Sequence, residues 1–332
     1  MNDHLVDVKG LCIDAPVGRL VDDVSFHIDS GEALGVVGES GSGKSLTARA
    51  LIALTADGLR VSGSVRVAGH DVPGLRGRAL RQFRGRSVGM IFQDPRAHIN
   101  PVRSIGDFLV EPLVLERRQR PDAARRRVLA ILDEVGVSDG ARRLRQYPHE
   151  LSGGLLQRVM IASVLAAEPA LILADEPTTA LDVTSQADVM AILTEQRRER
   201  GLALLFITHD LELAAATCDR TAVMYAGRLV ETADSTGLQE RPGHPYTSGL
   251  MVSRPSIDLR ATRLPVVPGR PVAAFEAGPG CAFAPRCPHA QTACERERPE
   301  ARESGGTMVA CHRAAELAGS LPTTIEEVSV HG

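Results

Sequence analysis

One short segment restricts the possible fold more than any other. The apolar run Ala33–Val37 leads directly into a glycine-rich loop that fits the pattern Gly, four residues, Gly, Lys, Ser/Thr, and we expect a helix over Ser45–Leu54 after it. Backbone N–H groups in such a loop converge on phosphate groups, and the start of the helix adds partial positive charge. The segment predicts a phosphate site formed by Gly38, Glu39, Ser40, Gly41, Ser42, Gly43, Lys44 and Ser45.

Two features support this interpretation over a chance glycine-rich turn. Lys44 is one of only two lysines in the chain, and its position in the loop lets it reach the β- and γ-phosphates of a nucleotide. Asp175 and Glu176 follow a second apolar run, where a strand would present them at its carboxyl end. We predict that Asp175 and Ser45 bind Mg²⁺ and that Glu176 orients the attacking water.

The remaining pattern indicates a mixed α/β domain. Alternating residues from Leu5 to about Ile28, and again over Ser64–Gly69, are typical of antiparallel strands. Apolar runs at Leu171–Ala174 and Ala203–Ile207 are typical of parallel strands covered on both faces, and Thr184–Arg200 between them predicts a helix. Helical periodicity extends from about residue 108 to 144.

Several further motifs then identify a family. Leu151-Ser152-Gly153-Gly154 with Gln157-Arg158, Gln93 in Phe92-Gln93-Asp94-Pro95, Ala180-Leu181-Asp182, and His209 in Thr208-His209-Asp210 occur in the order found in ATP-binding subunits of ABC transporters. Over residues 5–235 the chain resembles that family. The resemblance implies an ABC ATPase core of the P-loop NTPase class, with an antiparallel β subdomain and a helical subdomain that carries the signature motif.

The same resemblance implies roles for these residues. Glu176, His209 and Gln93 are the expected catalytic residues, with ATP and Mg²⁺ as cofactors, and Gln93 is expected to link Mg²⁺ to a loop that touches a membrane partner. Ser152, Gly153 and Gly154 begin an expected helix, Leu155–Ala166, whose free N–H groups form a second anion site. By resemblance this site contacts the ATP held by a second ATPase subunit, in a homo- or heterodimer.

One position departs from the family pattern. The family usually has an aromatic residue near the first strands that stacks on adenine, but Ala15 occupies that position and no aromatic residue precedes Phe26. We therefore expect either that another side chain covers the base or that the partner subunit supplies more of the affinity.

The composition changes near residue 240. Seven Pro and five Gly fall between Arg241 and Gly280, and four of the six cysteines follow. We predict an ATP-binding domain over residues 1–240 and an irregular extension over 241–332. Four thiolates are able to hold zinc or a 4Fe–4S cluster, and four unrelated free thiols are the alternative. The predicted ligands are Cys281, Cys287, Cys294 and Cys311, with His289 and His312 as alternatives.

The extension resembles the C-terminal region of dipeptide, oligopeptide and nickel importer ATPases, on Gly280–Pro288, His244-Pro245-Tyr246-Thr247 and Val267-Pro268-Gly269. Members of that group carry an iron–sulfur cluster at such cysteines, so the resemblance favours a cluster over zinc. It implies an ABC importer ATPase with two transmembrane permease subunits and an extracytoplasmic solute-binding protein. Peptides are the expected solute, and nickel is the alternative.

Charge and hydropathy bear on whether the chain binds nucleic acid or spans a membrane. A net charge of −3 argues against a nucleic-acid-binding surface, and no apolar run approaches the roughly 18 residues that span a bilayer. We expect a peripheral protein on the cytoplasmic face of the cell membrane. The rival interpretations are a soluble ABC ATPase without a transport role and a subunit that binds ATP but leaves hydrolysis to its partner.

Overall fold

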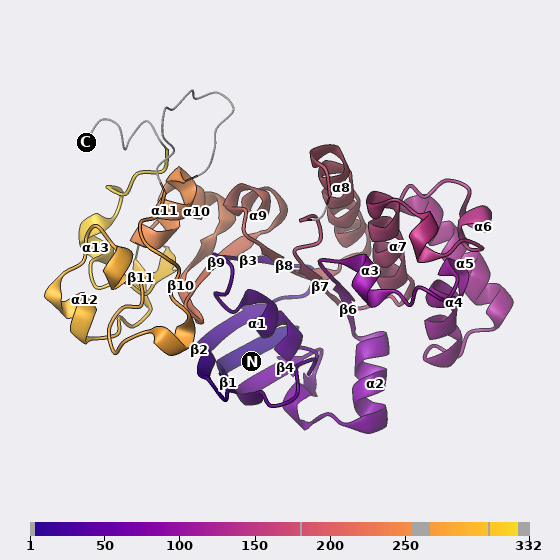
Figure 1. Cartoon of the computed structure of the whole chain (residues 1–332), viewed down its shortest axis with the longest axis horizontal. Coiled ribbons are helices and arrows are strands. Elements are labelled where there is room, and N and C mark those ends of the chain that lie inside the picture. Colours follow the sequence, from indigo (N-terminus) through magenta and orange to yellow (C-terminus); the bar gives the residue numbers. More distant parts are fainter. Residues whose placement is uncertain (1–3, 180, 254–265, 305, 325–332) are drawn as a thin grey trace.

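The computed structural model describes residues 4–179, 181–253, 266–304 and 306–324 (Figure 1). Within this part, an antiparallel sheet of four strands has the order β2-β1-β4-β5. Its strands are β1 (Val6–Ala15), β2 (Gly18–Ile28), β4 (Arg60–Val67) and β5 (His70–Asp71). Inward and outward residues alternate along β1, as the sequence pattern predicts for a sheet with one covered face.

A larger sheet of eight strands has the order β11-β12-β10-β9-β3-β8-β7-β6. The strands are β3 (Ala33–Val37), β6 (Val88–Ile91), β7 (Leu171–Asp175), β8 (Ala203–Thr208), β9 (Arg220–Tyr225), β10 (Arg228–Asp234), β11 (Arg302–Ser304) and β12 (Thr307–Val309). From β6 to β9 the pairing is parallel, and every residue of β3, β7 and β8 is buried. Parallel pairing brings the carboxyl ends of β3, β7 and β8 to one edge of the sheet.

Thirteen α-helices surround the sheets in the described part of the chain. They are α1 (Lys44–Ala50), α2 (Gly77–Arg86), α3 (Pro95–His98), α4 (Ile105–Leu115), α5 (Pro121–Glu134), α6 (Gly140–Arg143), α7 (Gly153–Ala166), α8 (Val183–Arg200), α9 (Leu211–Thr217), α10 (Ser235–Glu240), α11 (Pro245–Val252), α12 (Thr292–Arg296) and α13 (Ala314–Leu317). Four short 3₁₀ helices are η1 (Val72–Gly74), η2 (Pro148–Glu150), η3 (Ala274–Glu276) and η4 (Ala284–Arg286).

The helix after the glycine-rich loop is shorter than predicted. We expected Ser45–Leu54, whereas α1 ends at Ala50. The next residues form tighter turns, in which Leu51 N–H donates to Ala48 O and Ile52 N–H to Arg49 O, and Ala53 takes a left-handed backbone with φ of 50°. The helix thus ends in local turn hydrogen bonds at a position that neither glycine nor proline marks in the sequence.

Helices α4 to α7 form a lobe on the β6 side of the sheet, seen at the right of Figure 1. The apolar positions predicted for α5, including Val128, Ile131 and Leu132, are buried in it. Two arginines that precede or belong to α5, Arg117 and Arg127, bind the end of α7. Arg117 donates to Ala167 O and Arg127 Nε to Ala166 O, where helix carbonyls carry partial negative charge.

The residues after the predicted boundary at 240 pack on the opposite side of the sheet (Figure 1). Strand β12 pairs antiparallel with β10, so the extension continues the ATPase sheet rather than standing apart from it. Tyr225 of β9 packs against Tyr246 and Phe283 of the extension, with ring centroids 4.6 and 5.4 Å away. No helix in the described residues is long and apolar enough to cross a membrane.

Candidate nucleotide site

The glycine-rich loop lies between the buried end of β3 and the start of α1. A side chain at Gly38 would place its Cβ 2.1 Å from Met224 O, so only glycine fits between the loop and β9. The Lys44 ammonium donates to Gly38 O and Glu39 O, at 2.7 and 3.0 Å. Burial lowers the pKa of Lys44, against the opposing effect of the carboxylates nearby. This buried cation is suited to bind an anion that replaces its lost hydration.

Two predicted magnesium ligands lie in direct contact. Ser45 Oγ donates to Asp175 Oδ1 at 2.7 Å, although 130 residues separate them in the sequence. Asp175 ends β7 and is almost fully buried, and burial raises the pKa of its carboxyl group. Arg49 Nη2 lies 3.7 Å from the other carboxylate oxygen. A hydroxyl and a carboxylate at the base of a phosphate loop fit a Mg²⁺ ion, which prefers oxygen ligands.

Three polar side chains gather around Glu176, the residue after Asp175. Its Oε2 accepts hydrogen bonds from Thr179 Oγ1 at 3.0 Å and Gln93 Nε2 at 3.3 Å, and His209 Nδ1 lies 3.8 Å away. Glu176 adopts a φ of 46°, a left-handed conformation that is uncommon outside glycine and is concentrated at functional sites. The three expected catalytic residues, Gln93, Glu176 and His209, therefore lie close together. Thr179 was missed because its only signal was its place three residues after Glu176.

One cavity of about 800 Å³ adjoins the phosphate loop and the side chains around Glu176. Its lining residues are Leu20, Ser40, Gly41, Gly43, Lys44, Ser45, Leu46, Gln93, Glu176, Thr179, His209, Ala273, Ala274 and Phe275. The last three belong to the C-terminal extension, and no sequence motif links that extension to this site. Ala15, the position expected to face the base, is not among the lining residues.

The extension also holds the phosphate loop directly. Arg286 of η4 forms a two-pronged ion pair with Glu39, at 2.7 and 3.0 Å, and its side chain is only 4% exposed. The hydroxyl of Tyr246 accepts a hydrogen bond from Glu39 N–H at 2.9 Å. Both residues stand in motifs that identified the extension, but nothing local to those motifs indicates a contact with a residue more than 200 positions earlier.

The signature residues do not reach this cavity. Ser152 caps α7 by accepting a hydrogen bond from Leu155 N–H at 3.4 Å, and Gly153 and Gly154 form the first turn. Helix α7 lies in the helical lobe, apart from α1 (Figure 1), and none of the three residues lines the cavity. A single chain thus assembles the phosphate loop, Asp175, Glu176, Gln93 and His209, but leaves the signature unengaged.

The four cysteines of the extension line one small cavity together with His244, His289 and His312. Burial raises the pKa of the Cys281, Cys287 and Cys311 thiols, and Cys294 is buried. Within the described chain, His4, His27 and Asp29 form the one group of three or more ligand atoms lying within 4.8 Å of one another. No three of the four sulfur atoms therefore lie within 4.8 Å of one another.

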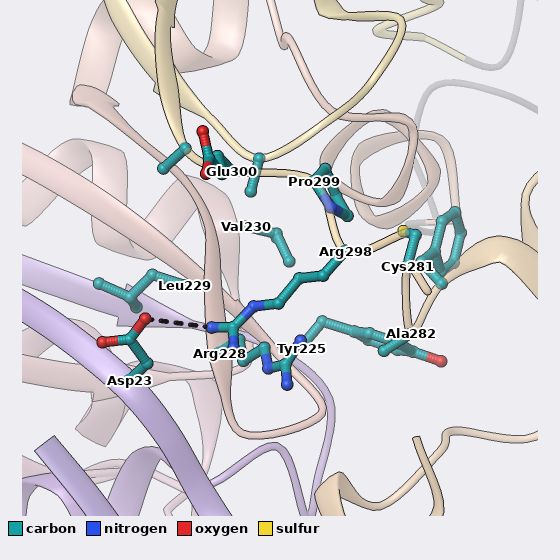
Figure 2. A pocket seen from close by; sticks show the side chains of 13 residues that line it. Asp23, Tyr225, Arg228, Leu229, Val230, Cys281, Ala282, Arg298, Pro299 and Glu300 are labelled. Atoms are coloured by element: carbon teal, nitrogen blue, oxygen red, sulfur yellow. Dashed lines mark hydrogen bonds and ion pairs between the residues drawn. The ribbon is translucent and has the colours of Figure 1, made fainter. Parts of the chain in front are cut away.

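Figure 2 shows another cavity, of about 500 Å³, where the extension meets β10. Arg298 reaches across it to Asp23, with Nη2 and Oδ2 3.3 Å apart. Cys281 lies at its edge and lines the cysteine cavity as well. Of the two remaining cysteines, Cys218 is buried, and Cys12 Sγ accepts a hydrogen bond from Asp23 N–H at 3.3 Å.

Comparisons with known proteins agree with this arrangement. The family described as "ABC transporter" matches residues 21–179, and "Oligopeptide/dipeptide transporter, C-terminal region" matches residues 230–294. The oligopeptide transport ATP-binding protein OppD of Escherichia coli is 41% identical over 318 residues, covering 95% of this chain and 94% of that protein. OppD of Salmonella typhimurium is 42% identical over 296 residues, covering 89% and 88%.

A solved structure shows the same core. It is the dimeric post-hydrolysis state of the ATP-binding cassette MJ0796 bound to ADP and Pi, with a TM-score of 0.62 and 27% identity. The match covers 69% of this chain and 98% of that one. About a third of this chain therefore has no counterpart in that structure.

Proposed function

The chain belongs to the ATP-binding subunits of ABC transporters, and from this membership we propose that it hydrolyses ATP to drive the uptake of peptides. The observation that carries the proposal is the convergence of Lys44, Glu176 and His209 on one cavity, in a chain whose extension matches the oligopeptide/dipeptide transporter region. Asp175 reaches this cavity through its hydrogen bond with Ser45. Nickel is the alternative solute.

The proposed roles follow from the contacts. Lys44 and the loop N–H groups would bind the phosphates, and Ser45, Asp175 and Gln93 would hold a Mg²⁺ ion that neutralises phosphate charge. Glu176 orients and polarises the attacking water, because it lies beside the Mg²⁺ ligands with Thr179, Gln93 and His209 around its carboxylate. His209, whose side chain is 63% exposed, remains available to contact the γ-phosphate.

The proposed assembly follows from what one chain lacks. Ser152, Gly153 and Gly154 lie outside the cavity of their own chain, so we place them against the ATP of a second ATPase subunit. Two membrane-spanning permease subunits and an extracytoplasmic solute-binding protein complete the transporter, and the chain lies on the cytoplasmic face of the membrane. A rival subunit that only binds ATP would not need the contacts around Glu176.

The test is peptide uptake by proteoliposomes that contain the assembled transporter. Lys44→Ala removes the buried phosphate-binding cation and should abolish both ATP hydrolysis and uptake of a labelled oligopeptide. Lys9→Ala is the matched control, because Lys9 is the other lysine and is 71% exposed on β1. Peptide uptake that survives Lys44→Ala would refute the proposal. Uptake of nickel without uptake of peptide would show that nickel, rather than peptide, is the transported solute.

For the extension we propose a 4Fe–4S cluster held by Cys281, Cys287, Cys294 and Cys311. Its support is the one cavity that all four cysteines line, since four thiolates are the ligand set of such a cluster. Zinc is the alternative.

Protein purified without oxygen should contain about four iron and four sulfide per chain and absorb visible light. Cys294→Ser should lose this iron, whereas Cys12→Ser should retain it. Colourless protein that contains zinc, or no metal, would exclude the cluster.

A further inference from the structure

The nucleotide cavity has two chemically different ends. Gln93, Glu176, Thr179 and His209 supply polar groups beyond the phosphate loop. Leu20, Ala273, Ala274 and Phe275 supply an apolar wall. A nucleotide has matching ends, because its phosphates are anionic and the faces of its base are apolar. The apolar wall therefore suits the base.

Phe275 is the aromatic residue at this wall. The chain has seven Phe, three Tyr and no Trp, all within the described ranges, and among them Phe275 alone lines the cavity. Phe26, the first aromatic in the sequence, is buried in the core beneath the N-terminal sheet. Tyr225, Tyr246 and Phe283 pack on one another and are buried. Phe275, in contrast, leaves 45% of its surface exposed.

Contacts along β2 place Phe275 beside the phosphate loop. A side chain at Gly43 would lie 3.4 Å from Leu20 O, and one at Gly18 would lie 2.8 Å from Phe275 Cβ. Gly18 has a φ of 131° and lets η3 approach the strand closely. Leu20 and Gly18 are two residues apart on one strand, about 7 Å at the usual rise. The ring thus lies a short distance along β2 from the loop.

The turn that carries Phe275 is fixed on both sides. Arg270 forms a two-pronged ion pair with Glu276, at 2.8 and 2.9 Å, and Glu276 Oε2 also accepts a hydrogen bond from Ala273 N–H at 3.0 Å. Beyond the turn, Arg286 binds Pro268 O at 2.7 Å and Glu39 of the phosphate loop. The aromatic ring and the phosphate loop are therefore held in one framework.

We infer that Phe275, supplied by the C-terminal extension, stacks on the base of the bound nucleotide. It takes the place of the aromatic residue that is absent from the N-terminal strands. The inference rests on the proposed ATP site, and it adds that the extension is part of that site.

The chain's lack of Trp gives a direct test. In Phe275→Trp the new residue is the single Trp of the full-length protein, so MgATP should change its fluorescence, whereas Mg-tripolyphosphate, which has no base, should not. In Phe275→Ala the dissociation constant for MgATP should rise roughly 10- to 100-fold, as base–aromatic stacking predicts, while that for Mg-tripolyphosphate should stay unchanged. Met308→Ala is the matched control, because Met308 is also 45% exposed in the extension but lies outside the cavity.

The outcomes separate the inference from the proposed function. Wild-type protein that binds neither MgATP nor Mg-tripolyphosphate would refute the ATP site itself. If Lys44→Ala abolishes MgATP binding while Phe275→Ala leaves it unchanged, the site stands and the stacking role is wrong. Equal loss of MgATP and tripolyphosphate binding in Phe275→Ala would also overturn the inference, since it would show a general distortion of the loop.

Discussion

The two ends of the nucleotide cavity are built in different ways. At the phosphate end, eight consecutive loop residues and two adjacent acids lie in the ATPase core, with a buried Lys44 and a 2.7 Å bond from Ser45 to Asp175. At the other end, a half-exposed Phe275 is held against β2 by a turn of the extension. The comparison teaches that the groups facing the phosphates lie in motifs of the ATPase core, whereas the cover over the base comes from a distant segment. That segment also contacts the phosphate loop, through Arg286.

The largest expected effect tests the phosphate end. Glu176→Gln keeps the shape of the side chain but removes the negative charge that polarises the attacking water. ATP hydrolysis by the assembled transporter should fall about 100- to 10,000-fold, the range typical for loss of a general base. Binding of MgATP should persist, because Lys44 and the loop remain. Hydrolysis is measured by phosphate release and binding by equilibrium titration.

Glu195→Gln is the control for this change, since Glu195 is an exposed acid on α8 outside the cavity. A transporter that hydrolyses ATP at the wild-type rate with Glu176→Gln would contradict the proposed mechanism. Loss of ATP binding in the same variant would instead show that Glu176 supports the loop, and the two ends would then be less independent than the contacts suggest.

We expect an intermediate loss of stability and affinity when the ion pair between the extension and the phosphate loop is broken. Arg286→Ala leaves Glu39 of the phosphate loop without its partner, and truncating one member of a buried ion pair typically costs about 3–5 kcal/mol. Glu39 is 23% exposed, so we expect about 2–3 kcal/mol less stability. Urea unfolding of the full-length protein measures this loss. Binding of MgATP and of Mg-tripolyphosphate should weaken together, unlike in Phe275→Ala.

Arg302→Ala provides the comparison, because Arg302 is 81% exposed in the same extension. The double variant Glu39→Gln with Arg286→Ala should be less destabilised than the sum of the two single variants, since the pair interacts. Additive effects would show that Arg286 acts through the extension alone.

This contrast also explains what the sequence was able to predict. The strands and the P-loop class were predictable from the apolar runs and the glycine-rich motif, and the roles of Gln93 and His209 were implied by the resemblance to ABC transporter ATPases. The end of α1 at Ala50 was not predictable, because no Gly or Pro marks it and the left-handed residue after the helix is Ala53. Neither was the pairing of β12 with β10.

The base end of the cavity escaped prediction for a similar reason. Ala15 showed only that the usual base-stacking aromatic residue is missing. The sequence near Phe275 contains no motif that points to a nucleotide. The contact that brings this segment to the site joins Arg286 to Glu39 across 247 positions. Long-range ion pairs of this kind depend on the docking of the whole extension, which a single sequence does not reveal.

The smallest expected effect concerns the turn itself. Arg270→Ala removes the ion pair that braces Glu276 beside Phe275, but both charges lie at the surface, where such pairs contribute little. MgATP binding should weaken by no more than about fivefold, and Mg-tripolyphosphate binding should not change. Because the pKa of Glu276 is lowered to about 2 by Arg270, the pair is intact above its ordinary value of 4.5 and is lost only as the pH falls toward 2. The difference between wild type and Arg270→Ala should therefore be constant from pH 6 to 8, as measured by titration.

Arg296→Ala, an exposed arginine at the end of α12, should leave both affinities at the wild-type value. A loss in Arg270→Ala as large as that in Phe275→Ala would show that the ion pair, rather than the close packing of η3 on Gly18, sets the position of the ring. No loss at all would show that this packing is sufficient. Either result sharpens the contrast between the two ends, because the phosphate loop has no comparable dependence on a surface ion pair.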